Sequence, residues 1–206
     1  MLSLENLLKL GRVKKTTMQM MQDRGYNVNE EFLKMTDLDL VMTYVKKAID
    51  EEKSLGESMN ECYSNICLIF LDFNYDEVKK KEKMICCEQA KNAMQKWKEF
   101  YRTKNCIVVS PGKMSPDAKK EFDDPRLTVM THEYLSFPVG RHCMVPKHSV
   151  LSDEEKKRFI EVRKIQPFEL PQIKKSDPIS IYYGFKLYDI VKVERPAWTV
   201  FRVVTP

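Results

Sequence analysis

The sequence predicts a mixed α+β and α/β fold in two small domains, one over residues 1–139 and one over residues 140–206. Three observations lead to this prediction. Strand-like and helix-like segments alternate between residues 66 and 134, two short capped helices and a hairpin follow residue 140, and Pro138 and Gly140 mark a boundary between the two patterns. A chain of 206 residues can hold one large domain or two small ones.

The first fifty residues predict two helices. Apolar residues recur at helical spacing over residues 2–22, and Gly25 is suited to the left-handed position that ends a helix. Asn29 can cap a second helix that runs to about Lys47. Residues 50–61 are polar and predict a loop or a frayed helix. The buried face of the second helix is expected to contain Phe32, Leu33, Leu40, Val41, Tyr44 and Val45.

The next segments predict a small three-layer-like sheet with helices. Residues 66–73 are a continuous apolar run, typical of a strand that is covered on both faces, and residues 76–83 are a charged, solvated turn. A long amphipathic helix over 84–102 precedes a strand at 106–109 and a short helix from Ser115 and Pro116. A further strand follows at 127–134. This order predicts an α/β sheet with right-handed crossovers.

The C-terminal segment carries local signals for helix ends. Ser152 and Glu155 form a capping box, and Pro167 ends the helix that they begin. Asp177 precedes Pro178 as a second N-cap, and Gly184 ends that helix. Residues 189–194 and 199–204 read as two strands of a hairpin. A module of this size is near the lower limit for independent stability, and it more often docks on a partner than performs chemistry.

Composition restricts the class of protein. The net charge is +5, and neither half of the chain is basic enough to hold nucleic acid by itself, so any DNA contact should be auxiliary. The sequence contains no apolar run long enough to predict a membrane span. Its first residues do not resemble a secretory signal. The six cysteines lack zinc-binding spacing, and Cys86 and Cys87 are expected to be reduced core thiols. The sequence therefore predicts a reducing compartment, cytoplasm or nucleus.

Two possible chemical sites are disfavoured. His142 and His148 flank Pro146 on an expected loop and could face one another, but no third ligand is near, so hydrogen bonding is favoured over a metal site. Asp72, Glu77 and Lys79 could form a magnesium-dependent nuclease site on a small α/β sheet. The run of lysines after Glu77 looks solvated, which disfavours catalysis. No catalytic residue, metal or cofactor is expected.

A third candidate lies between Lys113 and Lys120. Ser115 before a proline-started helix leaves backbone amides directed outward, which is a ready contact for phosphate. The alternative is an ordinary capped helix on the surface.

The chain resembles a known family at two places more than a hundred residues apart. His142–Cys–Met–Val–Pro–Lys–His148, Leu170–Pro–Gln–Ile173, Ser176–Asp–Pro178 and Tyr183–Gly184 resemble the C-terminal assembly domain of the fifth-largest subunit of eukaryotic nuclear RNA polymerases, and its small archaeal counterpart. The string Met21–Gln–Asp–Arg–Gly–Tyr26 resembles the end of the first helix of that family.

The resemblance implies a non-catalytic subunit of a multisubunit DNA-directed RNA polymerase. Residues 1–139 would be a jaw domain near downstream double-stranded DNA, and residues 140–206 an assembly domain that docks on the largest subunit beside other subunits. The implied DNA-facing residues are Lys113, Ser115, Pro116, Lys119 and Lys120. The implied docking residues are His142, Val145, Pro146, Lys147, His148, Asp177, Pro178, Tyr183 and Arg195.

Three departures from the family pattern indicate a diverged member. Asp117 stands where the family tends to have a small uncharged residue, and it would repel phosphate. The final hairpin, Arg195–Pro–Ala–Trp–Thr199, is shorter and lacks glycine, and Tyr188 replaces a glycine. These departures suggest a large DNA virus or a fast-evolving microbe, with the protein in the nucleus or, for a virus, in the host cytoplasm or virion. A stand-alone nuclease is the alternative function.

Overall fold

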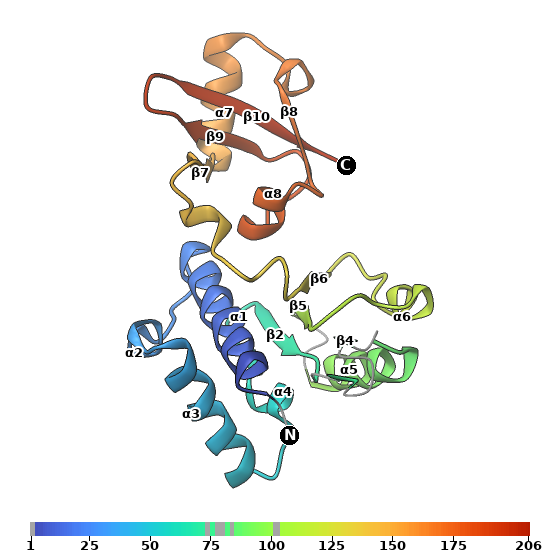
Figure 1. Cartoon of the computed structure of the whole chain (residues 1–206). Helices are drawn as coiled ribbons and strands as arrows, with labels where there is room; N and C mark the ends of the chain where they lie inside the picture. Colours follow the sequence, from blue (N-terminus) through green and yellow to red (C-terminus); the bar gives the residue numbers. More distant parts are fainter. Residues whose placement is uncertain (1–2, 73–74, 77–80, 83–84, 101–103) are drawn as a thin grey trace. The chain divides into compact units, whose positions relative to one another are not determined.

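The computed structural model describes residues 3–72, 75–76, 81–82, 85–100 and 104–206 (Figure 1). These residues form two compact units. The N-terminal unit contains the residues up to Gln19 and Tyr26–Phe137, and the C-terminal unit contains Met20–Gly25 and Pro138–Pro206. Within the described ranges, no helix is long and apolar enough to cross a membrane.

Helix α1 (Leu4–Asp23) confirms the first predicted helix and ends just before Gly25, which has a φ of +86°. Leu10, Val13 and Met18 of this helix are buried. From Met20 onward its residues belong to the C-terminal unit. The sequence gives no sign of this division, because the helical spacing of apolar residues continues across it.

The prediction of one helix from Asn29 to Lys47 is wrong, because the structure has two. Asn29 caps α2 (Glu30–Lys34), and Thr36 caps α3 (Asp37–Asp50) by accepting a hydrogen bond from Asp39 N at 3.2 Å. The second cap starts a new helix where the sequence pattern was continuous. Of the expected buried face, Leu40, Val41 and Tyr44 are buried, whereas Phe32, Leu33 and Val45 are half-buried.

The start of α3 is fixed by its contact with α1. A Cβ atom at Gly11 would lie 2.0 Å from the carbonyl oxygen of Asp37, so only glycine permits this approach. The carboxylate of Asp37 lies 3.5 Å from Arg12 Nε and 3.9 Å from Lys15 Nζ. Lys15 Nζ also donates to Met35 O at 2.6 Å, in the break between α2 and α3. Packing on α1 therefore explains why the helix is interrupted.

The N-terminal sheet has the predicted α/β character. Its strand order is β1-β2-β5-β6, in which β2, β5 and β6 are parallel and β1 is antiparallel to β2. The strands are β1 (Glu61–Cys62), β2 (Ile66–Phe70), β5 (Asn105–Ser110) and β6 (Leu127–Thr131). Strand β6 ends three residues before the predicted end, where a turn begins with a hydrogen bond from Tyr134 N to Thr131 O at 3.0 Å.

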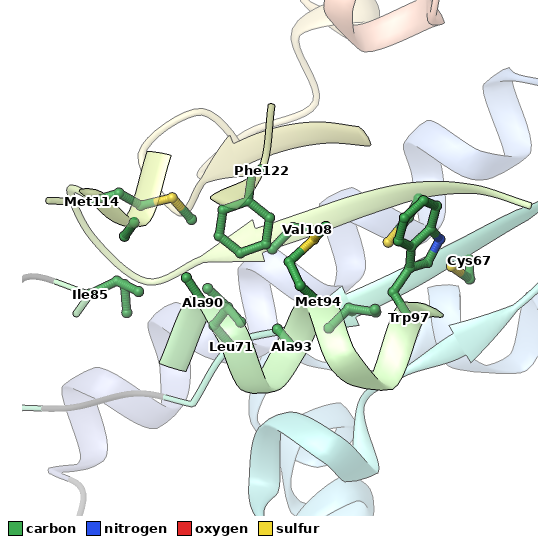
Figure 2. Packing of buried hydrophobic residues seen from close by; sticks show 13 residues of the cluster. Cys67, Leu71, Ile85, Ala90, Ala93, Met94, Trp97, Val108, Met114 and Phe122 are labelled. Atoms are coloured by element: carbon green, nitrogen blue, oxygen red, sulfur yellow. The ribbon is translucent and has the colours of Figure 1, made fainter. Parts of the chain in front are cut away.

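Helix α5 (Cys87–Phe100) covers one face of this sheet (Figure 2). Its residues Ala90, Met94 and Trp97 pack with Cys67 of β2 and Val108 of β5. Helix α6 (Pro116–Glu121) packs against α5 and continues this layer. The predicted helix ends at residues 84 and 101–102 fall outside the described residues.

The opposite face of the sheet is covered as well. All five residues of β2 are buried, and Lys14 of α1 lies over the ring of Phe70 at 4.8 Å. Residues 50–61, expected to be a loop or a frayed helix, contain α4 (Leu55–Ser58) with Ser54 as its N-cap. Helices on both faces confirm the three-layer-like arrangement.

A two-stranded ribbon, β3 (Tyr75–Asp76) with β4 (Lys81–Glu82), lies where the charged turn was expected. The centre of that turn, residues 77–80, is outside the described part of the chain.

The N-terminal core contains a fully buried lysine, Lys14. Lys14 Nζ lies 2.7 Å from both Glu61 Oε1 and Met59 O. Glu61 also accepts hydrogen bonds from Tyr44 Oη at 2.9 Å and from Tyr63 Oη at 2.6 Å. Burial lowers the pKa of Lys14 to about 8, although the charge of Glu61 opposes this shift. The network satisfies the buried charge but does not fully compensate for its desolvation.

The C-terminal unit is built on a four-stranded sheet with the order β7-β9-β10-β8. Strands β9 (Ile190–Glu194) and β10 (Thr199–Thr205) confirm the predicted hairpin. The outer strands, β7 (Lys147–Val150) and β8 (Gln172–Lys174), were not predicted, because each is short and lacks a clear alternating pattern. Strand β7 is antiparallel to β9, and β8 is parallel to β10. Two 3₁₀ turns, η1 (Val139–Arg141) and η2 (Pro167–Glu169), lie in the connecting segments.

Helix α7 (Asp153–Arg163) lies on this sheet and starts with the predicted capping box (Figure 1). Ser152 Oγ accepts from Glu155 N at 3.2 Å, and Glu155 Oε2 accepts from Ser152 N at 2.8 Å. The ring of Phe159 packs on Phe201 with centroids 4.3 Å apart. The helix ends at Lys164 in a left-handed conformation, earlier than the predicted end at Pro167.

Tyr188 occupies a position that glycine would occupy without strain. Its φ is +67°, in the left-handed region that a residue with a Cβ atom seldom adopts. Tyr188 N donates to Val204 O at 2.9 Å, and Tyr188 O accepts from Lys156 Nζ at 2.7 Å. Tyr188 therefore forms this turn at the cost of backbone strain.

The expectation that Cys86 and Cys87 are core thiols is wrong. Cys86 precedes α5 and is exposed, and Cys87 is the first residue of α5 and is half-buried. The face of α5 that enters the core begins only at Ala90.

The Lys14 network gives a test of stability. Glu61→Gln should lower the free energy of unfolding by about 2–3 kcal/mol, because it leaves a buried ammonium without its counter-ion. Lys14→Met should cost less, because Glu61 is 23% exposed and keeps its two tyrosine donors. Between pH 8 and 9.5 the unfolded chain binds more protons at Lys14 than the folded chain does, so wild-type stability should rise relative to Lys14→Met.

Urea unfolding of the full chain at several pH values measures these differences. Equal losses in both variants, with no relative change with pH, would show that the pair is solvated.

Candidate functional site

The segment from Lys113 to Lys120 forms a capped, positively charged surface helix. Ser115 caps α6 by accepting from Ala118 N at 3.1 Å, and Pro116 occupies the first helical position. Lys113, Lys119 and Lys120 are exposed. Lys120 Nζ lies 3.3 Å from Asp117 Oδ1, so Asp117 neutralises part of this charge.

The backbone around this helix is held firmly. Ile85 N donates to Lys113 O at 3.1 Å, and Ser115 N donates to Ile85 O at 3.2 Å. Met114 is buried between these two bonds. The exposed lysines therefore extend from a fixed base.

The prediction that His142 and His148 both lie on a loop is wrong for His148. His142 follows η1, and its Nδ1 accepts from Met144 N at 3.2 Å. His148 lies in β7, where its Nδ1 donates to Pro146 O at 2.7 Å. Partial burial lowers the pKa of His148, although the bond to Pro146 opposes the shift. Its ring stacks on Tyr183 with centroids 6.3 Å apart. In the described part of the chain, no group of three His, Cys, Asp or Glu residues is placed to hold a metal ion.

Two of the expected docking residues meet at a surface pocket. Pro146 and Arg195 line a pocket of about 650 Å³ together with Cys143, Met144, Glu194 and Pro196. Met144 is 82% exposed. Trp198, which lies with Arg195 in the turn between β9 and β10, is 59% exposed. Lys147 lies opposite Glu194 in the β7–β9 pair, and Val145 N donates to His142 O at 2.9 Å. We call the pocket lined by Cys143, Met144, Pro146, Glu194, Arg195 and Pro196 the hairpin pocket.

The remaining docking residues lie on α8 (Pro178–Tyr183). Asp177 caps this helix by accepting from Ile179 N at 2.8 Å, and Pro178 is its first residue. Tyr183 stacks on Phe185 with centroids 5.6 Å apart and on His148. The predicted end is confirmed at Gly184, which has a φ of +70°. The expected docking residues thus fall into two groups, one at the hairpin pocket and one at α8.

A cluster that was not predicted as a site holds α8 in place. Arg24 donates from Nε to Tyr182 O at 2.8 Å and from Nη2 to Ile181 O at 2.7 Å, at the C-terminal end of α8. Asp23 accepts from Arg141 Nη2 at 2.8 Å and from Tyr182 Oη at 2.7 Å. Asp23 and Arg24 belong to the motif in residues 21–26 that carries the family resemblance. The motif alone did not identify their partners on η1 and α8.

Of the residues considered for a nuclease, Asp72 has a structural role. Asp72 Oδ1 accepts from Gly56 N at 3.0 Å, which ties the end of β2 to α4. Asp72 lines a small cavity of about 140 Å³ with Glu57 and Lys96, which form an ion pair with each other. Glu77 and Lys79 lie outside the described residues.

Comparison with known proteins decides the family. The N-terminal domain of RNA polymerase Rpb5 matches residues 5–113, and the C-terminal domain of RNA polymerase Rpb5 matches residues 137–205. The chain belongs to the RNA polymerase Rpb5 family. Residues 114–136, which include α6 and β6, lie between the two matched stretches.

Curated relatives match along nearly the whole chain. Subunit RPABC1 of DNA-directed RNA polymerases I, II and III from Caenorhabditis briggsae is 28% identical over 96% of this chain and 93% of its own length. The subunit of the same name from Dictyostelium discoideum is 26% identical over 98% of both chains. A DNA-directed RNA polymerase subunit 5-like protein from Arabidopsis thaliana is 26% identical over 93% of this chain and 90% of its own length.

The family gives the general function. This Rpb5 family member is a non-catalytic subunit of a multisubunit DNA-directed RNA polymerase and acts in transcription. The nuclease alternative is therefore not supported.

Arg24 provides a test of the α8 anchor. Arg24→Ala should lower the stability of the C-terminal unit by about 2–3 kcal/mol, because it removes two charge-assisted bonds to helix-end carbonyls. Arg24→Lys should retain only part of this stability, because an ammonium lacks the planar guanidinium geometry that bonds the carbonyl oxygens of Ile181 and Tyr182 together. Arg12→Ala is the matched control, since its side chain is 62% exposed beside Asp37, and should cost less than about 1 kcal/mol.

Hydrogen exchange of the α8 amides, with urea unfolding of the full chain, reports the change. The anchor is disproved if Arg24→Ala and Arg12→Ala have the same effect on α8.

Proposed function

We propose that residues 140–206 are an assembly domain that docks on the largest polymerase subunit, and that residues 1–139 are a jaw near downstream double-stranded DNA. The docking proposal is carried by one observation: Pro146 and Arg195, far apart in sequence, line the same hairpin pocket. Exposed Met144 and Trp198 beside it are the kinds of side chain that anchor protein interfaces. Arg195 is exposed at the rim and supplies a positive charge for a carboxylate of the partner.

The second group of docking residues supports a broader contact surface. Asp177 and Tyr183 position α8, and Pro178 at its start is exposed. His148 connects the two groups, because it lies in β7 beside Pro146 and stacks on Tyr183. We infer that the largest subunit covers both the hairpin pocket and the start of α8, with other subunits beside it.

The DNA proposal rests on charge and position in the N-terminal unit. Lys113 before α6 and Lys119 and Lys120 in its last turn are exposed, and Asp117 in its first turn opposes their charge. Three lysines with one carboxylate can make a few phosphate contacts but cannot hold DNA by themselves. The jaw would therefore add to the grip of a complex whose main DNA contacts lie in other subunits.

We also propose a location and a lineage. Relatives named as subunits of RNA polymerases I, II and III favour a nuclear protein shared among such enzymes. The strained Tyr188 and the hairpin without glycine favour a diverged lineage, such as a large DNA virus or a fast-evolving microbe. For a viral chain, the location would be the host cytoplasm or the virion.

The docking surface can be tested by assembly. Met144→Ala combined with Arg195→Ala should reduce co-purification of the largest subunit by roughly tenfold, because it removes an exposed apolar anchor and its neighbouring charge. Val162→Ala combined with Arg158→Ala is a matched control on α7, since Val162 is as exposed as Met144 at 82%. Quantitative pull-down with the full-length chain measures both.

Equal recovery of the largest subunit with the two double variants would place the docking surface elsewhere in the C-terminal unit.

The DNA contact can be tested through salt dependence. Lys119→Ala with Lys120→Ala should shorten the lifetime of elongation complexes at raised salt. In a plot of log lifetime against log salt concentration, the steepness of the slope should fall by about one unit for each phosphate that the variant no longer neutralises. Asp117→Ser should lengthen the lifetime, because it removes a like charge and releases Lys120 from its 3.3 Å ion pair. Assembly should be unchanged in both variants.

Equal lifetimes for wild type and both variants across a salt series would show that α6 is an ordinary surface helix.

A further inference from the structure

Three cysteines occupy one row across the N-terminal sheet. Cys62 of β1 is paired with Cys67 of β2, and Cys67 is paired with Cys106 of β5. Directly paired residues of neighbouring strands place their side chains on the same face of a sheet. The row runs from solvent into the core, because Cys62 is exposed whereas Cys67 and Cys106 are buried. Figure 2 shows Cys67 beside Trp97 in that core.

The register brings Cys62 and Cys67 close enough to bond. Tyr63 N donates to Ile66 O at 2.8 Å in the turn between β1 and β2. Because hydrogen-bonded and non-hydrogen-bonded pairs alternate in an antiparallel ladder, the next pair, Cys62 and Cys67, is of the non-hydrogen-bonded kind. Such pairs have Cα atoms about 4.5 Å apart, which is inside the range that a disulfide spans.

A lysine lies directly against the exposed thiol. Lys104 Nζ is 3.0 Å from Cys62 Sγ and donates to Tyr63 O at 2.8 Å. The ammonium of Lys104 therefore lies in contact with the sulfur at which an oxidant would react. Cys86, which is also exposed, has a neutral partner instead, the side-chain oxygen of Gln89 at 3.8 Å.

The buried end of the row also favours reaction at Cys67. The hydrogen bond with Cys106 lowers the pKa of Cys67, as does the charge of Lys104, against the effect of burial. The same hydrogen bond, together with burial, raises the pKa of Cys106. Of the two buried thiols, Cys67 is the one that is paired directly with Cys62.

We propose that Cys62 and Cys67 are a peroxide-reactive thiol pair, in which Cys62 is oxidised first and Cys67 resolves it to a disulfide. The Cys62 sulfur attacks a hydroperoxide: an S–O bond forms, the O–O bond breaks, and the leaving oxygen takes the proton of the Cys62 thiol to give water or an alcohol. Cys67 then attacks the sulfenic sulfur: an S–S bond forms, the S–O bond breaks, and the departing hydroxide takes the Cys67 proton as water. The two thiols supply the two electrons, and an external dithiol reverses the change.

The experiment treats the reduced full-length chain with limiting hydrogen peroxide and blocks the remaining thiols at successive times. Mass spectrometry of unreduced peptides should find a Cys62–Cys67 cross-link. Oxidation of Cys62 should be roughly fivefold faster than that of Cys86 and Cys143, the other exposed thiols, which serve as internal controls. Lys104→Met should remove most of that advantage, and Lys104→Arg should retain it.

Variants at the second position separate the two steps. Cys67→Ser should abolish the cross-link and leave a sulfenic acid at Cys62 that dimedone traps. Cys67→Ala provides the same test if serine disturbs the core, and circular dichroism of each variant confirms folding. Oxidation of Cys62 no faster than the controls would overturn the proposal. So would conversion of Cys62 to sulfinic acid in the wild type without any cross-link to Cys67.

Discussion

The C-terminal unit depends on two charged residues that come from the end of the first helix. The guanidinium of Arg24 bonds the last carbonyls of α8, and Asp23 accepts from Arg141 and Tyr182. A helix end without such partners would leave buried carbonyls unsatisfied. A Cβ atom at Gly184 would lie 3.2 Å from this guanidinium, so the cap and the anchor constrain one another. The position of Tyr183, and of the proposed docking surface beside it, follows from this anchor.

In a non-catalytic subunit, perturbed ionisable groups can serve structure. Lys14 and Glu61 would attract attention in an enzyme, because burial lowers the pKa of the lysine and two tyrosines donate to the glutamate. Here they connect α1 to β1 inside an apolar core. Specific pairing of a buried charge penalises other packings of the same helices, and we infer that it fixes how α1 lies on the sheet.

Two turns of the C-terminal unit lie on its surface without a glycine. Tyr188 forms a left-handed turn without glycine, and Arg195 and Pro196 of the turn between β9 and β10 line the hairpin pocket. Strands β9 and β10 pair without interruption across Val191 and Val193, which are buried. Core packing restricts the strands, whereas an exposed turn is restricted by whatever partner covers it.

Elements with local causes could be predicted from the chain alone: the capping box at Ser152, the Asp177 cap, the hairpin and the alternating sheet pattern. The family resemblance, which gave the function, could be recognised in the same way. Contacts in three dimensions were needed for the break before α3, which depends on the close approach at Gly11, and for the short edge strand that contains His148. Such contacts were also needed to predict the burial of Lys14, a charged residue on the apolar face of α1, because its partner Glu61 is distant in the sequence. These outcomes depend in part on partners distant in the chain, although the Thr36 cap that begins α3 is itself a local signal.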